Sequence, residues 1–289
     1  MFNNQLTLND GRQLSYAVYG NPRGFPILFF HGTPGSRYEC SFVDGQQLGE
    51  DTCMIVVDRP GYGLSDPKNN RTILNWTNDV KQLLDHLGLL KVDVVGVSGG
   101  GPYALACAVK LEEYVNHVAI VCGIGPLAIS GDSGSVSDDE KRSSIEKELS
   151  APEKMAEQIA QMHAHPEAMG EETTNNLSEF DRSVIMPDIV KKWIKNVKEA
   201  TRSPEGMITD YKLLLQSWEV ALNEISIPVY FWHGYQDDMV SLQHPRFLAE
   251  QIQGAELEFI EGAGHLGAAI VGTRNAVSLF KEKRESNDF

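Results

Sequence analysis

A serine flanked by glycines is the first candidate for chemistry. The segment Gly96-Val97-Ser98-Gly99-Gly100 has the form G-x-S-x-G. It follows an apolar run, residues 92–97, and precedes a helical pattern at residues 102–110, which is the strand–turn–helix context that a nucleophilic serine of this kind requires. Side chains two positions either side of the serine would collide with neighbouring backbone, and the helix amino terminus directs N–H groups at the site. Ser98 is the predicted nucleophile, and a glycine-rich structural turn is the alternative.

A second loop of small residues, His31-Gly32-Thr33-Pro34-Gly35-Ser36, follows the apolar run at residues 27–30. A kinked loop at this place can present a backbone N–H to the nucleophile. Together with the N–H of Gly99, the N–H of Thr33 would form a two-donor oxyanion hole, in which each donor stabilises a tetrahedral intermediate by about 3 kcal/mol. An ordinary Pro-Gly turn is the alternative explanation of this loop.

Short apolar runs alternate with helical patterns along much of the chain. Such runs are typical of strands buried on both faces, and their alternation with helices predicts a mostly parallel sheet covered on both sides. The runs are residues 26–30, 54–57, 92–97, 118–122, 228–232 and 257–260, with helical patterns at 73–87 and 102–110. Before them, two β runs around Asp10-Gly11 have the form of a hairpin, from Leu6 to Leu8 and from Gln13 to Tyr19.

A segment from about residue 127 to residue 217 interrupts this alternation. It is rich in Glu, Lys, Met and helix-start signals, and strand-like runs resume after it, so we expect a helical insertion into one sheet domain. One helix face is marked by Ile189, Val190, Trp193, Ile194 and Val197. The predicted organisation is a first core part (residues 1–126), a helical cap (127–217) and a second core part (218–289).

Three motifs together resemble the α/β-hydrolase superfamily in their order and spacing. They are HGTPGS after one strand, DRPGYGLSD (Asp58 to Asp66) after the next, and GVSGG after the third. The resemblance extends from about residue 5 to residue 285, apart from the cap. It implies an α/β fold with an eight-stranded, mostly parallel sheet flanked by helices, and the chain order nucleophile, acid, histidine. The superfamily uses the turn at Asp58 and Arg59 structurally, so neither residue is assigned a catalytic role.

The chain order implied by the resemblance leads to one acid. In this superfamily the acid follows a late strand, usually as Gly-x-x-Asp, and the segment Gly234-Tyr235-Gln236-Asp237 places it at Asp237. Asp238 is the alternative. Some members have the acid after the preceding core strand, but residues 122–126 of this chain hold no carboxylate.

The base is predicted at His265. Of the eight histidines, it is the one beyond the last strand in a loop of small residues, where nothing bulky restricts the imidazole. A histidine also suits base catalysis near neutral pH. His163 and His165 do not indicate a metal site, because residues two apart on a helix point to different faces.

These residues predict acyl transfer in two steps. His265 takes the proton of Ser98 as the serine oxygen attacks a carbonyl, and Asp237 holds the imidazole tautomer. Water activated by His265 then releases the acid from the acyl-enzyme. The reaction needs no cofactor and no metal. The resemblance argues against haloalkane dehalogenation and epoxide hydrolysis, since superfamily members with those activities have Asp as nucleophile.

Several substrates suit this triad, and a small carboxylic ester is favoured. The superfamily alternatives are a proline iminopeptidase, a carbon–carbon bond hydrolase, a cofactor-free perhydrolase, and a non-catalytic ligand-binding protein on the same fold. Glu171 and Glu172 either bind a substrate amine, as cap carboxylates of the iminopeptidases do, or belong to the solvated surface. Those enzymes typically have a second glycine where this chain has Thr33, which ranks peptidase below esterase. Five cap methionines either line an apolar pocket or pack helix against helix: Met155, Met162, Met169, Met186 and Met207.

The composition of the 289-residue chain is typical of a soluble globular protein, with 42% hydrophobic and 22% charged residues. Its formal charge of −15 argues against nucleic acid or an anionic membrane as partner. Four widely spaced cysteines do not suggest a disulfide scaffold. No secretion signal is recognised, and the longest nearly apolar run is shorter than the ~20 residues that span a bilayer. We expect a cytoplasmic protein that acts on a small-molecule substrate.

Overall fold

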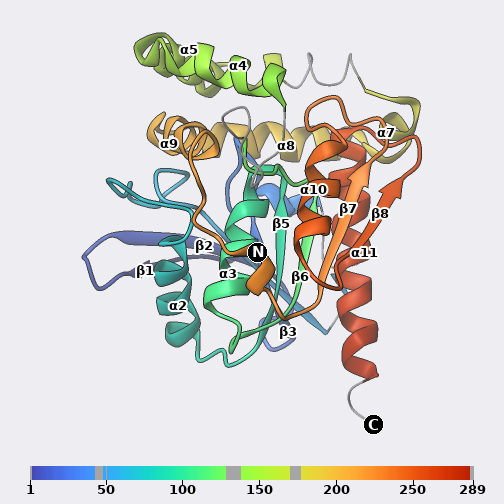
Figure 1. Ribbon diagram of the computed structural model, residues 1–289. Coiled ribbons are helices and arrows are strands. Elements are labelled where there is room, and N and C mark those ends of the chain that lie inside the picture. Colours follow the sequence, from blue (N-terminus) through green and yellow to red (C-terminus); the bar gives the residue numbers. More distant parts are fainter. Residues whose placement is uncertain (1, 43–47, 50, 128–137, 170–176, 287–289) are drawn as a thin grey trace.

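The computed structural model describes the chain except residues 1, 43–47, 50, 128–137, 170–176 and 287–289. One sheet of eight strands forms its centre, in the order β1-β2-β4-β3-β5-β6-β7-β8 (Figure 1). The strands β1 and β2 form an antiparallel pair, β2 is antiparallel to β4, and the strands from β4 to β8 in this order run parallel. The predicted fold class is confirmed. The bounds are β1 (Phe2–Thr7), β2 (Gln13–Gly20), β3 (Phe25–Phe30), β4 (Thr52–Val57), β5 (Val92–Val97), β6 (Val115–Val121), β7 (Val229–Gly234) and β8 (Glu256–Ile260).

The central strands are apolar because both of their faces are buried. Along β3, Leu28 and Phe30 belong to one hydrophobic layer, while Ile27 and Phe29 belong to the other. Every residue of β4, β5 and β7 is buried. Alternate side chains of a strand point to opposite faces, so a sheet covered on both sides requires continuous apolar runs, as the sequence predicted.

Helices cover both layers. The first layer contains Val80 of α2 (Trp76–Leu87), Leu105 of α3 (Gly101–Lys110) and Leu248 of α10 (Gln243–Gln251). The second contains Ala268 and Phe280 of the long helix α11 (His265–Glu285). Loops follow the carboxyl ends of the parallel strands, and all of the predicted site residues lie in or directly after these loops.

The amino-terminal hairpin starts earlier than the sequence predicted. Gly11 makes the expected turn with a φ of 87°, but β1 begins at Phe2, whereas the apolar pattern begins at Leu6. The residues between them carry little apolar signal. They are ordered by antiparallel pairing with β2, in which Phe2 lies opposite Val18.

Between β6 and β7 the chain forms a group of helices that we call the helical insertion. Figure 1 shows them gathered beyond one end of the sheet. The residues predicted to mark a helix face lie in α8. Its described helices are α4 (Asp139–Leu149), α5 (Pro152–Ala164), α7 (Glu179–Val184), α8 (Pro187–Ala200) and α9 (Glu205–Leu214). The described residues also form the 3₁₀ helices η1 (Glu39–Phe42), η2 (Ser98–Gly100) and η3 (Leu222–Glu224).

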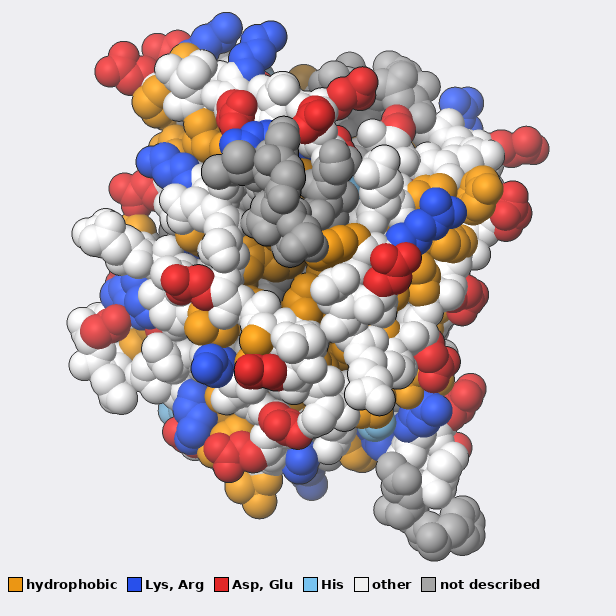
Figure 2. All heavy atoms as spheres, viewed as in Figure 1, with side chains coloured by type: hydrophobic (Ala, Val, Ile, Leu, Met, Phe, Trp, Pro, Cys, Tyr) orange, Lys and Arg blue, Asp and Glu red, His pale blue; other side chains and the backbone are white. Residues whose placement is uncertain are grey.

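The surface carries charges of both signs. Figure 2 shows acidic and basic side chains interspersed over one face, so the acidic excess is not gathered into a single patch there. Among the described residues, no helix is both long and apolar enough to cross a membrane.

Candidate active site

The turn that carries Ser98 has a strained backbone. Ser98 directly follows β5, begins η2 and has a φ of 51°, in the left-handed region that residues with side chains rarely adopt. A Cβ on Gly96 would stand 2.7 Å from the carbonyl oxygen of Gly100, and a Cβ on Gly100 would stand 2.7 Å from that of His31. Both glycines are therefore sterically required, as predicted, and the turn holds Ser98 at the carboxyl edge of the sheet.

A hydrogen bond joins two of the predicted site residues. Nδ1 of His265 and Oδ2 of Asp237 lie 2.7 Å apart. Asp237 follows β7 and His265 begins α11 after β8, so the loops after two neighbouring strands bring the two side chains together. The other carboxylate oxygen of Asp237 accepts the N–H groups of Met239 and Val240, each at 2.9 Å. Asp238, the alternative acid, is exposed.

The environment of Asp237 favours its ionised form. Burial alone would raise the pKa of Asp237, but the charge and hydrogen bond of His265, the charge of His233 and the Val240 N–H outweigh it. The pKa of Asp237 therefore lies below its ordinary value. An ionised carboxylate at this place can orient the imidazole and stabilise it once it is protonated.

Ser98 and His265 line the same cavity, of about 190 Å³. Its polar side chains are Thr33, Glu39, Ser98 and His265. The rest of the wall is apolar and comes from both parts of the chain. The helical insertion supplies Met169, Leu177, Ile185, Ile189, Val190 and Trp193. The core supplies Gly32, Pro34, Val97, Met239, Leu266, Ala269 and Ile270.

The five methionines of the helical insertion differ in their surroundings. Of the five methionines, Met169 lines the cavity, while Met155 and Met207 are buried in a small hydrophobic cluster that the insertion forms with Tyr62 of the core. Met186 is 57% exposed. Both alternatives given for the methionines therefore hold, each for different residues. Residues 171 and 172, the predicted amine-binding glutamates, lie outside the described part of the chain.

The two predicted oxyanion-hole residues are neighbours. A Cβ on Gly99 would stand 3.4 Å from the backbone nitrogen of Thr33, and a Cβ on Gly32 would stand 3.5 Å from the Cβ of Ser98. The loop after β3 therefore lies against the turn that carries the serine. The Thr33 hydroxyl is also occupied: it donates to Oδ2 of Asp210 at 3.1 Å and accepts from Arg59 at 3.0 Å.

Asp210 of α9 is the centre of a buried ionic network that holds this loop. Its carboxylate pairs with Arg59 at 2.7 Å and also with Arg71, and it accepts the hydroxyls of Tyr62 and Tyr103. Burial would raise the pKa of Asp210, but the two guanidinium groups hold it well below its ordinary value. Arg59 donates in turn to the carbonyl oxygen of Gly32, at 3.0 Å, and to that of His31. The structural role expected of Arg59 fits these contacts.

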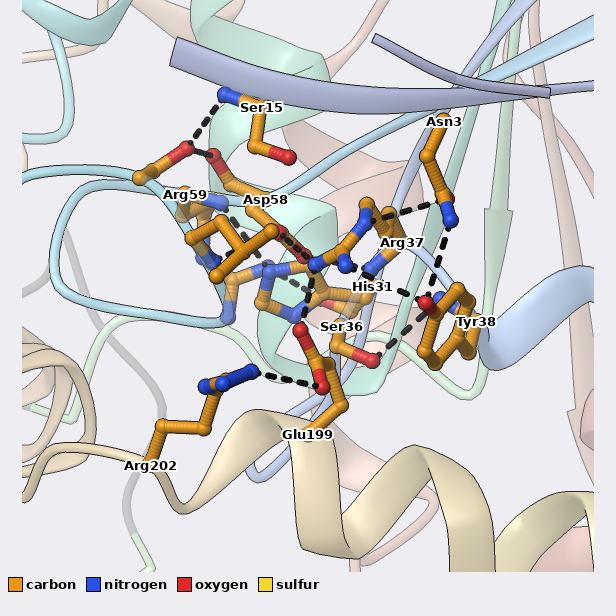
Figure 3. Close-up of polar contacts among 12 residues, drawn as sticks. Asn3, Ser15, His31, Ser36, Arg37, Tyr38, Asp58, Arg59, Glu199 and Arg202 are labelled. Carbon is orange, nitrogen blue, oxygen red and sulfur yellow. Dashed lines mark hydrogen bonds and ion pairs between the residues drawn. The ribbon is translucent and has the colours of Figure 1, made fainter. Parts of the chain in front are cut away.

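A second network holds the same loop from its other end. Figure 3 shows Arg37 between two carboxylates, Asp58 at 2.6 Å and Glu199 of α8 at 2.7 Å. The backbone N–H of Arg59 donates to Nε2 of His31, whose ring is buried. Burial, followed by the charge of Arg59, places the pKa of His31 well below its ordinary value. His31 is thus a neutral, structural hydrogen-bonding group.

One group of the described residues approaches the arrangement of a metal site. Donor atoms of Cys122, His233 and Asp237 lie within 4.8 Å of one another. However, Asp237 is bonded to His265, and Nε2 of His233 lies 2.8 Å from the carbonyl oxygen of Val240. Burial also raises the pKa of the Cys122 thiol well above its ordinary value, which disfavours the thiolate that metals bind. These three residues therefore do not fit a metal ion.

Sequence reasoning missed three carboxylates around the site: Glu39, Asp181 and Asp210. Two arginines in otherwise buried segments, Arg59 and Arg71, were the available signal for Asp210, because buried guanidinium groups need an acidic partner. Glu39 and Asp181 gave no comparable signal, since their partners are the backbone N–H groups of Gly32 and Gly264, which no side-chain pattern in the sequence indicates.

Comparisons with known proteins extend over nearly the whole chain. Residues 26–268 match a family model described as alpha/beta hydrolase fold. An uncharacterized hydrolase of Bacillus subtilis, YcgS, is 28% identical over 89% of each chain, and a proline iminopeptidase of Lactobacillus acidophilus is 23% identical over 96% of each. The solved structure of a bromoperoxidase from Bacillus anthracis superposes with a TM-score of 0.74 at 22% identity, covering 97% of this chain and 100% of its own.

The family match spans most of the chain, the sheet has the expected eight, mostly parallel strands, and a strained serine turn follows its central strand β5. The chain therefore belongs to the α/β-hydrolase fold family.

Proposed function

We propose that this protein is a serine hydrolase that cleaves a small ester-like carbonyl substrate through an acyl-enzyme on Ser98. The observation that carries the proposal is the 2.7 Å hydrogen bond between Asp237 and His265 at a cavity that Ser98 also lines. The apolar walls suit a substrate with a hydrocarbon group, and the few polar side chains line the same cavity as the serine.

In the proposed mechanism His265 removes the hydroxyl proton of Ser98 while the serine oxygen attacks the carbonyl carbon. Asp237 accepts the Nδ1–H bond and stabilises the imidazolium. The N–H groups of Thr33 and Gly99 stabilise the oxyanion of the tetrahedral intermediate. The imidazolium then protonates the leaving alcohol, and in the second half a water molecule, activated by His265, releases the acid and restores Ser98.

A fluorophosphonate probe tests the nucleophile directly. We expect the wild-type protein to be labelled at Ser98, and Ser98→Ala to lose both labelling and the hydrolysis of a short-chain p-nitrophenyl ester. Ser144→Ala, an exposed position on α4, is the matched control and should behave as the wild type. Labelling that persists in Ser98→Ala would refute the assignment. Labelling of the wild type without turnover of esters or aminoacyl amides would instead favour a ligand-binding protein on this fold.

A further inference from the structure

Glu39 places a carboxylate inside the reactive cavity. It begins η1 and lines the cavity with Ser98 and His265, whereas most of the wall is apolar. Both of its oxygens accept the backbone N–H of Gly32, at 2.9 and 3.0 Å. A Cβ on Gly32 would stand 3.5 Å both from Oε1 of Glu39 and from the Cβ of Ser98, so these two atoms are at most 7 Å apart.

Two buried carboxylates near the site are paired with guanidinium groups, whereas Glu39 has neutral hydrogen-bond partners. Asp58 pairs with Arg37, and Asp210 pairs with Arg59 and Arg71. Within the described part of the chain, the hydrogen-bond partners of Glu39 are the Gly32 N–H and the side-chain amide of Asn196.

The hydrogen-bond partners of Glu39 carry no charge to balance that of its carboxylate. Burial raises the pKa of Glu39 to about 7, although the Gly32 N–H, Arg59, Asn196 and His265 each act in the opposite direction. An ionised carboxylate in an apolar cavity is stabilised by a cation that forms a charge-assisted hydrogen bond with it. Glu39 lines the cavity, which is where a substrate would supply that cation.

We infer that Glu39 binds a protonated amine of the substrate, a few bonds from the carbonyl carbon that Ser98 attacks. This inference rests on the proposed function and narrows its substrate class to amino esters or amino amides. The amine lies beside Glu39, next to the loop after β3. The hydrocarbon part of the substrate packs against the apolar wall formed by α8 and α11. Glu39 thus determines specificity and takes no part in the proton transfers between Ser98 and His265.

Two matched substrates test the inference. They are the p-nitrophenyl esters of leucine and of 2,4-dimethylpentanoic acid, in which a methyl group replaces the ammonium. We expect the wild type to have the higher kcat/KM for the leucine ester. Glu39→Gln, which keeps an acceptor for the Gly32 N–H but loses the charge, should reduce that preference by roughly tenfold to a hundredfold. Its kcat/KM for the neutral ester should fall by less than its kcat/KM for the leucine ester, because the neutral ester has no ammonium group to lose its partner.

Glu261→Gln is the charge-matched control, because Glu261 is exposed and lies outside the cavity; it should keep the wild-type preference. A wild type that prefers the neutral ester would overturn the inference. An equal loss for both esters in Glu39→Gln would also overturn it and would make Glu39 a support of the loop after β3.

Two further measurements separate the possible failures. Fluorophosphonate labelling of Glu39→Gln reports whether the variant is folded and whether Ser98 is reactive, and failure of wild-type labelling would count against the proposed function itself. If the variant does not fold, the wild type alone decides: 3-methylbutylammonium should protect Ser98 from labelling at a lower concentration than neutral 3-methylbutan-1-ol, and the reverse order would overturn the inference.

Discussion

Asp181 of the helical insertion and Gly264 of the core are joined by a buried hydrogen bond. The Gly264 N–H donates to Oδ1 of Asp181 at 2.9 Å, directly before His265 in the chain. A Cβ on Gly264 would stand 2.7 Å from the second oxygen of Asp181. Nearby, the Ser178 hydroxyl donates to the Gly262 carbonyl oxygen at 3.0 Å. The insertion is therefore hydrogen-bonded to the loop that precedes His265. The close approach of Asp181 explains why position 264 requires glycine.

Replacing Asp181 by Ala should reduce both stability and activity. The Gly264 N–H would lose its buried acceptor, at a cost of about 1–3 kcal/mol in the free energy of unfolding. The loop would also hold His265 less accurately, so we expect kcat to fall by roughly tenfold to a hundredfold with a smaller change in KM. Denaturant titration and ester kinetics measure the two effects. Ser183→Ala, exposed on the same helix, should change neither, and a normal kcat in Asp181→Ala would contradict this positioning role.

Two adjacent carboxylates give a sharp test of the acid. Asp237→Asn should reduce kcat by about 10⁴-fold, as expected when the orienting carboxylate of a triad becomes an amide. Asp238→Asn, which makes the same chemical change at an exposed neighbouring position, should stay within a few-fold of the wild type. Rapid-quench or steady-state kinetics with one p-nitrophenyl ester is sufficient. If the larger loss belongs to Asp238→Asn, the assignment of the acid is wrong.

Asp210→Asn should destabilise the protein strongly. The substitution leaves Arg59 and Arg71 buried without their counter-charge, which typically costs about 3–5 kcal/mol. The measurement is the free energy of unfolding from urea titration at neutral pH. Asp188→Asn removes a carboxylate that is exposed and paired with Lys192, so it should cost less than about 1 kcal/mol. Equal effects of the two substitutions would show that the buried network contributes little.

Glu39 should also make stability depend on pH. Its pKa is raised to about 7 in the folded protein, mainly by burial, against an ordinary value of 4.5. The folded state therefore binds more protons than the unfolded state between these values, and the contribution of Glu39 to stability is present below about pH 4.5 and lost as the pH rises through 7. Arg59 and His265 are the charged or titratable groups that act on it.

Glu39→Gln lacks this titration, so its stability relative to the wild type should increase by about 3 kcal/mol between pH 4.5 and pH 8. The comparison uses chemical denaturation at each pH, and only the change with pH is interpreted. Glu261→Gln, the same substitution at an exposed position, is measured in parallel as the control. A constant difference between Glu39→Gln and the wild type would mean that Glu39 titrates alike in the folded and unfolded chains.

The sequence predicted the parts of the site that depend on local patterns. Ser98 could be recognised because the glycines around it and the apolar strand before it are contiguous, and His265 because its loop has small residues after the last strand. Glu39 and Asp210 could not, because their importance comes from contacts made after folding: Arg59 and Asp210 are 151 positions apart. Likewise, β1 extends to Phe2 through pairing with β2, although its residues lack an apolar pattern.

The network around Asp210 has a consequence for shortening this chain. A protein in which β6 is joined directly to β7 would keep Arg59 and Arg71 but lose the carboxylate that neutralises them. Arg59 would then hold the carbonyl oxygens of His31 and Gly32 with an uncompensated charge, and water would have to enter beside the serine. Removing the helical insertion would therefore disturb the loop after β3. Engineering of the substrate range is better directed at the apolar residues of α8, which can be exchanged one at a time.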